Sequence, residues 1–165
     1  MQLIPIPFEL QILEECRLGP YPNATHPGTA LMALKHGFKV DYLHIYKNIF
    51  VYPYGYPPDE VMSHEEFELK LSIDLEYIRQ ALRKGLKLVR LPSLTADELR
   101  TALRKGPILA MVDYSGSLHD IIIQGFDGNT FSIVDPAKGY ITYSERTLLH
   151  LVNTRYGVSL LNIYK

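Results

Sequence analysis

Two apolar runs on either side of a tight-turn signal constrain this 165-residue chain more than any other feature. Residues 119–125 are centred on three consecutive isoleucines, and residues 131–134 form the second run. Asp127-Gly128-Asn129 lies between them and is typical of a β-hairpin turn. Because the strand direction reverses at the turn, the start of the first run lies beside the end of the second. We therefore expect His119 and Asp135 to be near neighbours across the hairpin.

Other local signals in the second half predict strands and two short helices around this hairpin. Thr95 and Glu98 have the spacing of a capping box, which predicts a helix through Lys105. Ser144 is placed to cap another helix, which we expect to end at Val152. Apolar runs of strand length occur at 86–91, 108–112, 140–143 and 158–164.

Helix signals dominate the first half. An apolar segment that begins at Pro27 and ends before Gly37 predicts a buried helix, since proline suits a first turn and glycine a C-cap. A strand is expected at 40–46. The stretch between Ser63 and Gly85 fits both a strand and an amphipathic helix, and the residues at its two ends favour the helix. Helices come mostly first and strands mostly last, so the predicted fold class is α+β.

Composition limits the classes of function. There are 17 Lys and Arg residues against 18 Asp and Glu, so the chain lacks the basic excess of a nucleic-acid-binding protein. No segment reaches the roughly 18 apolar residues that a transmembrane helix needs, and residues 1–10 lack the basic start of a signal peptide. We therefore expect one cytoplasmic domain over residues 1–165, without nucleic-acid or membrane partners.

His119 and Asp135 carry the strongest chemical signal, because a histidine held by a carboxylate is the base-and-orienter pair of nucleophilic hydrolases. Asp120 is a poorer partner, since it points to the opposite face of the strand. His119 could instead be a hydrogen-bonded core histidine. His26, His119 and Asp135 could form a zinc site, although nothing in their spacing requires one. Cys16 is the only cysteine, which excludes an intrachain disulfide and a Cys-rich zinc site, and no metal or cofactor is expected.

The order of these segments resembles the C39 peptidases and the related C39-like domains of papain-like fold. In that family a Cys-Gly-Pro begins a buried helix, and a strand with the catalytic His and a Val-x-Asp-Pro strand come later. The resemblance spans roughly residues 24–140, with similar segments at 27–40, 94–99, 107–112, 119–127 and 133–136. It implies a buried N-terminal helix and further helices packed on a C-terminal antiparallel sheet, with His119 as catalytic base and Asp135 as its orienting residue.

The nucleophile of that family does not fall where the resemblance places it. Counting back without gaps from Gly37-Phe38 puts its position at Ala24. Cys16 could serve only if residues were inserted between it and the helix. Gln11, five residues before Cys16, has a spacing similar to that of the family's oxyanion-hole glutamine. Cys16 could equally be a small buried hydrophobe.

Two functions therefore remain open. The favoured one, because Ala24 occupies the nucleophile position, is a non-catalytic C39-peptidase-like domain that binds a peptide or a partner protein. The alternative is an active cysteine peptidase or amide hydrolase in which Cys16 attacks the carbonyl, His119 is the general base and Gln11 helps to stabilise the oxyanion. An aromatic wall for a peptide, or simply a rigid ordered loop, is predicted at Tyr52, Tyr54 and Tyr56.

Overall fold

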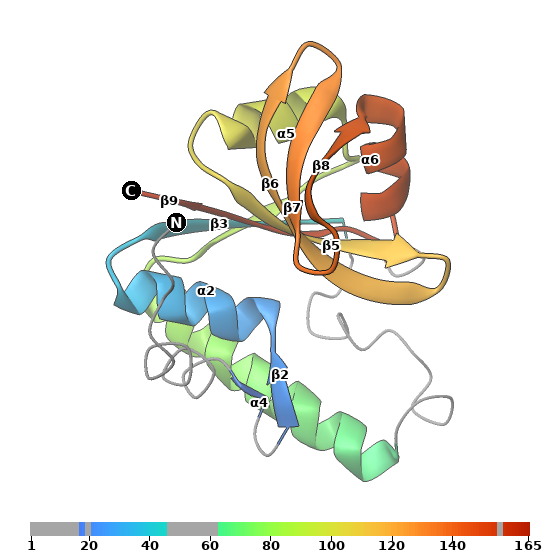
Figure 1. Cartoon of the computed structure of the whole chain (residues 1–165). Helices are drawn as coiled ribbons and strands as arrows, with labels where there is room; N and C mark the ends of the chain where they lie inside the picture. Colours follow the sequence, from blue (N-terminus) through green and yellow to red (C-terminus); the bar gives the residue numbers. More distant parts are fainter. Residues whose placement is uncertain (1–16, 19–20, 46–62, 155–156) are drawn as a thin grey trace.

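The computed structural model describes residues 17–18, 21–45, 63–154 and 157–165, and Figure 1 shows their arrangement. A seven-stranded sheet forms the centre and has the strand order β4-β3-β9-β5-β6-β7-β8. Its strands are β3 (Lys39–His44), β4 (Lys87–Arg90), β5 (Ile108–Tyr114), β6 (Ser117–Asp127), β7 (Thr130–Asp135), β8 (Gly139–Ser144) and β9 (Ser159–Tyr164). The described helices are α2 (His26–Lys35), α4 (His64–Arg83), α5 (Ala96–Leu103) and α6 (Glu145–Val152). A separate antiparallel ribbon consists of β1 (Arg17–Leu18) and β2 (Tyr21–Ala24).

The α+β class predicted from the sequence is confirmed, but the expectation of a C-terminal antiparallel sheet is wrong in two respects. The sheet is mixed, because β3 runs parallel to β4 with Asp41 opposite Lys87. Parallel neighbours need a crossover connection, and α4 lies in the connection between these two strands. The sheet also includes a first-half strand, since β9 lies between β3 and β5 and pairs with both. The β9 strand therefore connects the strands of the first half of the sequence to those of the second half by backbone pairing.

Helices cover both faces of the sheet, with α2 and α4 on one side and α5 and α6 on the other (Figure 1). The core beneath α5 and α6 contains Leu99, Ile121 and Leu148, all fully buried. The core on the other face contains Leu31 of α2 and Ile78 of α4. Alternation along each strand sends successive side chains to these two cores, and this decides which polar residues share a face.

The local helix signals are confirmed. Residues 64–83 form α4 rather than a strand, and Ser63 Oγ accepts a hydrogen bond from the Glu66 amide at 3.1 Å. At α5, the Thr95 hydroxyl accepts from the Glu98 amide while the Glu98 carboxylate accepts from the Thr95 amide, which completes the predicted capping box. The α2 helix begins at His26, one residue before the predicted start.

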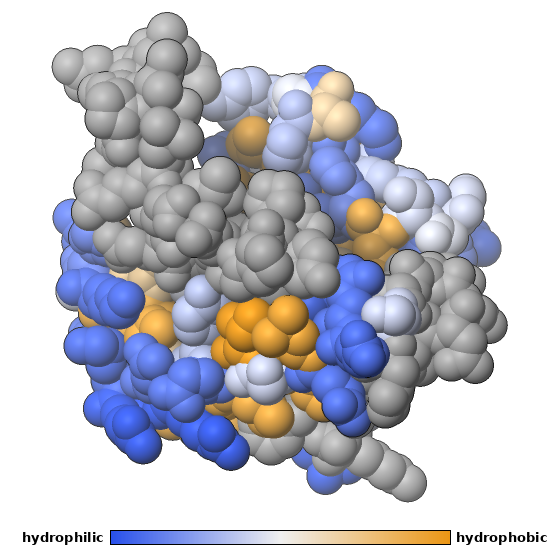
Figure 2. All heavy atoms as spheres, turned by 90° about the horizontal axis from the view of Figure 1, so that it is seen from below, coloured by the Kyte–Doolittle hydropathy of each residue, from blue (hydrophilic) through white to orange (hydrophobic). Residues whose placement is uncertain are grey.

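Figure 2 looks at the molecule from the side of α4, and apolar side chains are exposed near the middle of this face with hydrophilic residues beside them. The large apolar side chains of α4 that are exposed include Leu69 and Leu82. Within the described residues, none of the helices combines the length and the apolar character needed to cross a lipid bilayer. The Tyr-rich loop with Tyr52, Tyr54 and Tyr56 lies outside the described residues.

Candidate functional site

His119 and Asp135 lie on the sheet face that α5 and α6 cover. In the β6–β7 hairpin, Ile122 is opposite Val134, which places Asp135 diagonally across from His119. A register shift between Ile123 and Gly125 adds a bulge near the turn. The hairpin predicted from the turn signal is therefore present, with the two functional candidates as diagonal neighbours.

The two side chains form a direct hydrogen bond. His119 Nε2 lies 2.9 Å from Asp135 Oδ1, which confirms the expected contact across the hairpin. The Asp135 side chain is fully buried, whereas 29% of the His119 side chain is exposed. Among the described residues, none forms a hydrogen bond with His119 Nδ1 that accompanies the bond from Nε2. The Asp135 carboxylate therefore orients the imidazole through Nε2, and Nδ1 is the ring nitrogen left to accept a proton or a hydrogen bond.

Several hydrogen-bond donors stabilise the ionised form of Asp135. Tyr114 donates its hydroxyl to Oδ2 at 3.0 Å, and the Ala137 and Lys138 amides donate to Oδ1 at 2.8 and 3.3 Å. Burial by itself raises the pKa of Asp135, but the hydrogen bonds from His119, the Ala137 amide and Tyr114 outweigh it and lower the pKa to about 2. Asp135 is therefore ionised at neutral pH and fixes the orientation of His119.

Tyr114, Tyr143 and Lys138 extend the site. The Tyr114 hydroxyl lies 2.9 Å from the Tyr143 hydroxyl, and the Tyr114 ring is 5.7 Å from the His119 ring. Lys138 Nζ lies 3.7 Å from the centroid of the Tyr114 ring. Burial and the hydrogen bonds with Tyr143 and Asp135 raise the pKa of Tyr114, so it is a neutral donor. These residues were not singled out in the sequence, although Tyr114 lies on the same face as Val112, which is opposite His119.

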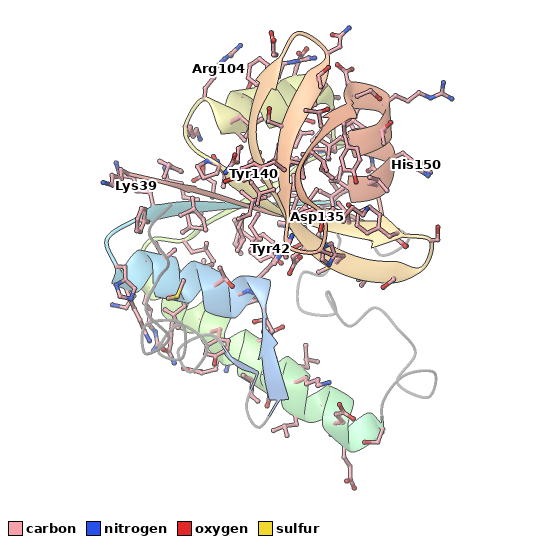
Figure 3. The ribbon with its side chains drawn as sticks, in the orientation of Figure 1. Lys39, Tyr42, Arg104, Asp135, Tyr140 and His150 are labelled. Atoms are coloured by element: carbon pink, nitrogen blue, oxygen red, sulfur yellow. The ribbon has the colours of Figure 1, made fainter. Side chains whose placement is uncertain are left out.

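A second polar cluster lies on the opposite face, at the start of α2. His26 Nδ1 is 2.7 Å from Ser159 Oγ, and His26 Nε2 is 3.1 Å from Asp120 Oδ1. The Tyr42 hydroxyl lies 2.9 Å from the same Ser159 Oγ. Figure 3 shows Tyr42 below the sheet, on the side of α2. Asp120 thus points away from Asp135, as expected from strand alternation.

This second cluster has the connectivity of a Ser-His-Asp triad but an unsuitable placement for catalysis. Ser159 is fully buried and His26 is 3% exposed, whereas 45% of the Asp120 side chain is exposed. Solvent therefore reaches the Asp120 carboxylate but not Ser159, which is the residue that would attack a substrate. Burial by itself raises the pKa of Asp120, but attraction to His26, the hydrogen bond with His26 and attraction to His119 outweigh it and hold the pKa below its usual value. The cluster is best explained as a structural network.

The side chains that begin α2 are already engaged. Thr25 is the N-cap residue and accepts from the Gly28 amide at 3.1 Å, while its hydroxyl donates to Asp74 at 2.7 Å. Both ring nitrogens of His26 have partners. The zinc site considered from the sequence is not formed, because His26 bonds Asp120 while His119 bonds Asp135. No group of His, Cys, Asp and Glu side chains that could hold a metal is found among the described residues.

Comparison of the chain with models of protein families, with curated proteins and with solved structures finds no match. By its own fold and site, the chain is an α+β protein with a mixed sheet and a buried carboxylate that orients a partly exposed histidine. Cys16 and Gln11 lie outside the described residues, and their catalytic roles stay predictions. Ala24 ends β2, immediately before the N-cap of α2.

Proposed function

We propose that this chain is a C39-peptidase-like domain of papain-like architecture that binds a peptide segment without hydrolysing it. The observation that carries the proposal is the start of α2, where the resemblance would place a nucleophile. There Ala24 has no nucleophilic atom, and the Thr25 hydroxyl and both ring nitrogens of His26 already have hydrogen-bond partners. The Thr25 hydroxyl donates to Asp74 and not to a histidine, so it lacks the imidazole base that would activate a hydroxyl nucleophile.

The His119 site offers groups that suit a peptide. His119 Nδ1 faces no described partner, and Lys138 contributes a cation beside Tyr114. The neighbouring β8 strand ends the sheet in the described part of the chain. An edge strand presents unpaired backbone groups to which an extended peptide can add. Tyr140 of β8 is 74% exposed and provides an aromatic contact on this edge, on the face of the sheet opposite to His119.

The second candidate function is a cysteine hydrolase, and one observation favours it. The 2.9 Å bond between His119 and the buried Asp135 leaves one imidazole nitrogen open, as a general base requires. In this function Cys16 would supply the thiolate and Gln11 an oxyanion donor. The two candidates differ in whether a bound peptide is cut.

One experiment separates them. Peptides that bind the protein are first selected from a displayed library of random heptapeptides. Their affinity is then measured by fluorescence anisotropy. After incubation with the protein, mass spectrometry shows whether they have been cleaved. The proposal expects intact peptides whose affinity falls at least tenfold in Tyr140→Glu. The matched control introduces a glutamate at the other edge of the sheet, as Leu88→Glu in β4, and should leave the affinity unchanged.

The other possible outcomes would contradict the proposal. Cleaved peptides, with cleavage abolished in both Cys16→Ala and His119→Ala, would establish the hydrolase instead. If no peptide is selected, or if both edge variants weaken binding equally, the proposed peptide site at β8 is wrong.

A further inference from the structure

A shallow hollow of about 410 Å³ lies on β6, β7 and β8, on the face of the sheet opposite to His119. In Figure 1 these strands extend away from α2 and α4, so the two helices leave this part of the face uncovered. The volume is within the range of about 300–1,000 Å³ that is typical of small-molecule sites. Six residues line the hollow: Gln124, Ser132, Ile133, Tyr140, Ile141 and Thr142.

Strand register brings the side chains of this hollow together. Tyr140 and Thr142 are two positions apart on β8 and share a face, and Ser132 of β7 is directly opposite Thr142. Gly125 of β6 pairs with Ser132, which places Gln124 beside it. The small side chains of Ser132 and Thr142 are thus flanked by the longer ones of Gln124 and Tyr140. This difference in size explains why the surface is hollowed here.

The polar side chains of the hollow are accessible and unengaged. Gln124, Ser132 and Thr142 are all exposed. Within the parts of the chain that the structure describes, none of these three side chains makes a hydrogen bond or an ion pair. An amide group and a hydroxyl group can each donate and accept, and no charged residue lines the hollow. These groups suit a neutral ligand that itself carries hydroxyl groups, because a charged ligand would find no opposite charge among them.

Tyr140 adds an aromatic surface beside these polar groups. At 74%, it is the most exposed large apolar side chain among the described residues. Ile122 is 37% exposed and lies in the same cross-strand row, with Val134 between it and Tyr140. Contiguous apolar surface of this kind is typical of binding sites. The hollow therefore offers a ligand one apolar contact surface and several hydrogen-bonding groups next to it.

We propose that this hollow binds a neutral saccharide, with a pyranose ring against Tyr140 and hydroxyl groups bonded to Gln124, Ser132 and Thr142. A pyranose has an apolar face of C–H groups, and its hydroxyls both donate and accept, so it matches both parts of the hollow. A linear polyol has similar hydroxyls but no ring face, so preference for a pyranose over a polyol is the signature of the site. The hollow shares Tyr140 with the proposed peptide edge, but β6, which carries Gln124, is two strands in from that edge.

The probes are four neutral trisaccharides, namely cellotriose, maltotriose, mannotriose and triacetylchitotriose, with the linear polyol glucitol as the control. Each is titrated into the full chain and followed by ¹H–¹⁵N spectra that include the side-chain amide of Gln124. We expect saturable binding of at least one trisaccharide with a shift of the Gln124 signal, and no saturable effect of glucitol. If no trisaccharide saturates, or if glucitol gives the same response, the proposal is wrong.

Substitutions at exposed positions test the location. Tyr140→Ala should weaken binding of the trisaccharide about fivefold or more, whereas Tyr140→Phe keeps the ring and should retain most of the affinity. Thr142→Ala should weaken binding about threefold or more, and Thr101→Ala, at an exposed position of α5, is its matched control. Binding that survives both Tyr140→Ala and Thr142→Ala, with folded spectra, would place the saccharide elsewhere and refute the site.

Gln124→Ala separates this site from the proposed peptide site. It removes an amide from the hollow, so trisaccharide binding should weaken about threefold or more. The affinity of the selected heptapeptides should not change, because they are expected along β8. Unchanged trisaccharide binding in Gln124→Ala would contradict the saccharide site and leave the peptide proposal intact. If no heptapeptide is selected while a trisaccharide binds and depends on Gln124, the peptide proposal fails and the saccharide site stands.

Discussion

Asp135, which is completely buried, accepts a 2.9 Å hydrogen bond from the partly exposed imidazole of His119. The carboxylate also receives a hydroxyl and two backbone amides, so it stays ionised in a place where a lone charge would be costly. Such an arrangement orients the imidazole and leaves its second nitrogen available. It serves a binding site and a general base equally well, which is why both candidate functions centre on it.

We predict that Asp135 makes the protein sensitive to acid. Its pKa is about 2 in the folded chain and 3.8 ordinarily, so its ionisation stabilises the fold above about pH 4. That contribution is lost as the pH falls from about 4 to about 2. Asp135→Asn should therefore be less stable than wild type at pH 7, and the difference should shrink over this range. Urea unfolding at pH 7, 4, 3 and 2 measures it, with the exposed Asp127→Asn as control. A difference independent of pH would contradict the prediction.

Removal of the buried serine hydroxyl should destabilise the second cluster. Ser159→Ala deprives His26 Nδ1 of its buried partner, which should lower the free energy of unfolding by about 1–3 kcal/mol. Ser132 is exposed on β7 and its side chain makes no hydrogen bond that we find within the described residues, so Ser132→Ala should change stability by less than about 0.5 kcal/mol. Chemical denaturation of both variants tests this. Equal effects would show that the network adds nothing to stability.

Gly106 is predicted to tolerate no side chain. A Cβ at this position would collide with the Ile163 carbonyl oxygen and lie 3.1 Å from the Tyr164 Cβ, both in β9. Gly106→Ala should cost about 1–3 kcal/mol, because the backbone of β9 would have to move. At Gly125 nothing lies within 4 Å of the added atom, so Gly125→Ala is the matched control. The thermal midpoints of the two variants should differ clearly, and similar midpoints would refute the steric argument.

The capping box of α5 should contribute measurably to stability. Thr95→Ala removes the hydroxyl that accepts from the Glu98 amide, with an expected loss of about 1 kcal/mol. Ser93→Ala, at an exposed residue two positions earlier, should be nearly neutral. Denaturant midpoints for the two variants provide the measurement. No difference between them would mean that the amide of Glu98 finds an equally good partner in water.

Local signals in the sequence were sufficient to predict most helices and strands and one contact of the candidate site. The turn at Gly128 brings His119 to Asp135 because a hairpin relates residues on either side of a turn at short separation. The caps at Thr95 and Ser144 mark helix starts by bonds that span three residues. These interactions lie within short segments, so the residue types alone predict them.

Only the tertiary structure decided the order of the strands and the long-range contacts that depend on this order. Ser159 meets His26 across 133 positions of sequence, and this contact exists because β9 inserts between β3 and β5. The same insertion places Asn162 opposite Asp41 of β3, and the pairing of β3 with β4 makes the sheet mixed. Each strand has backbone groups that can pair with many partners, so no short pattern specifies which two strands become neighbours. That choice depends on the burial of both sheet faces at once, which is a property of the whole chain.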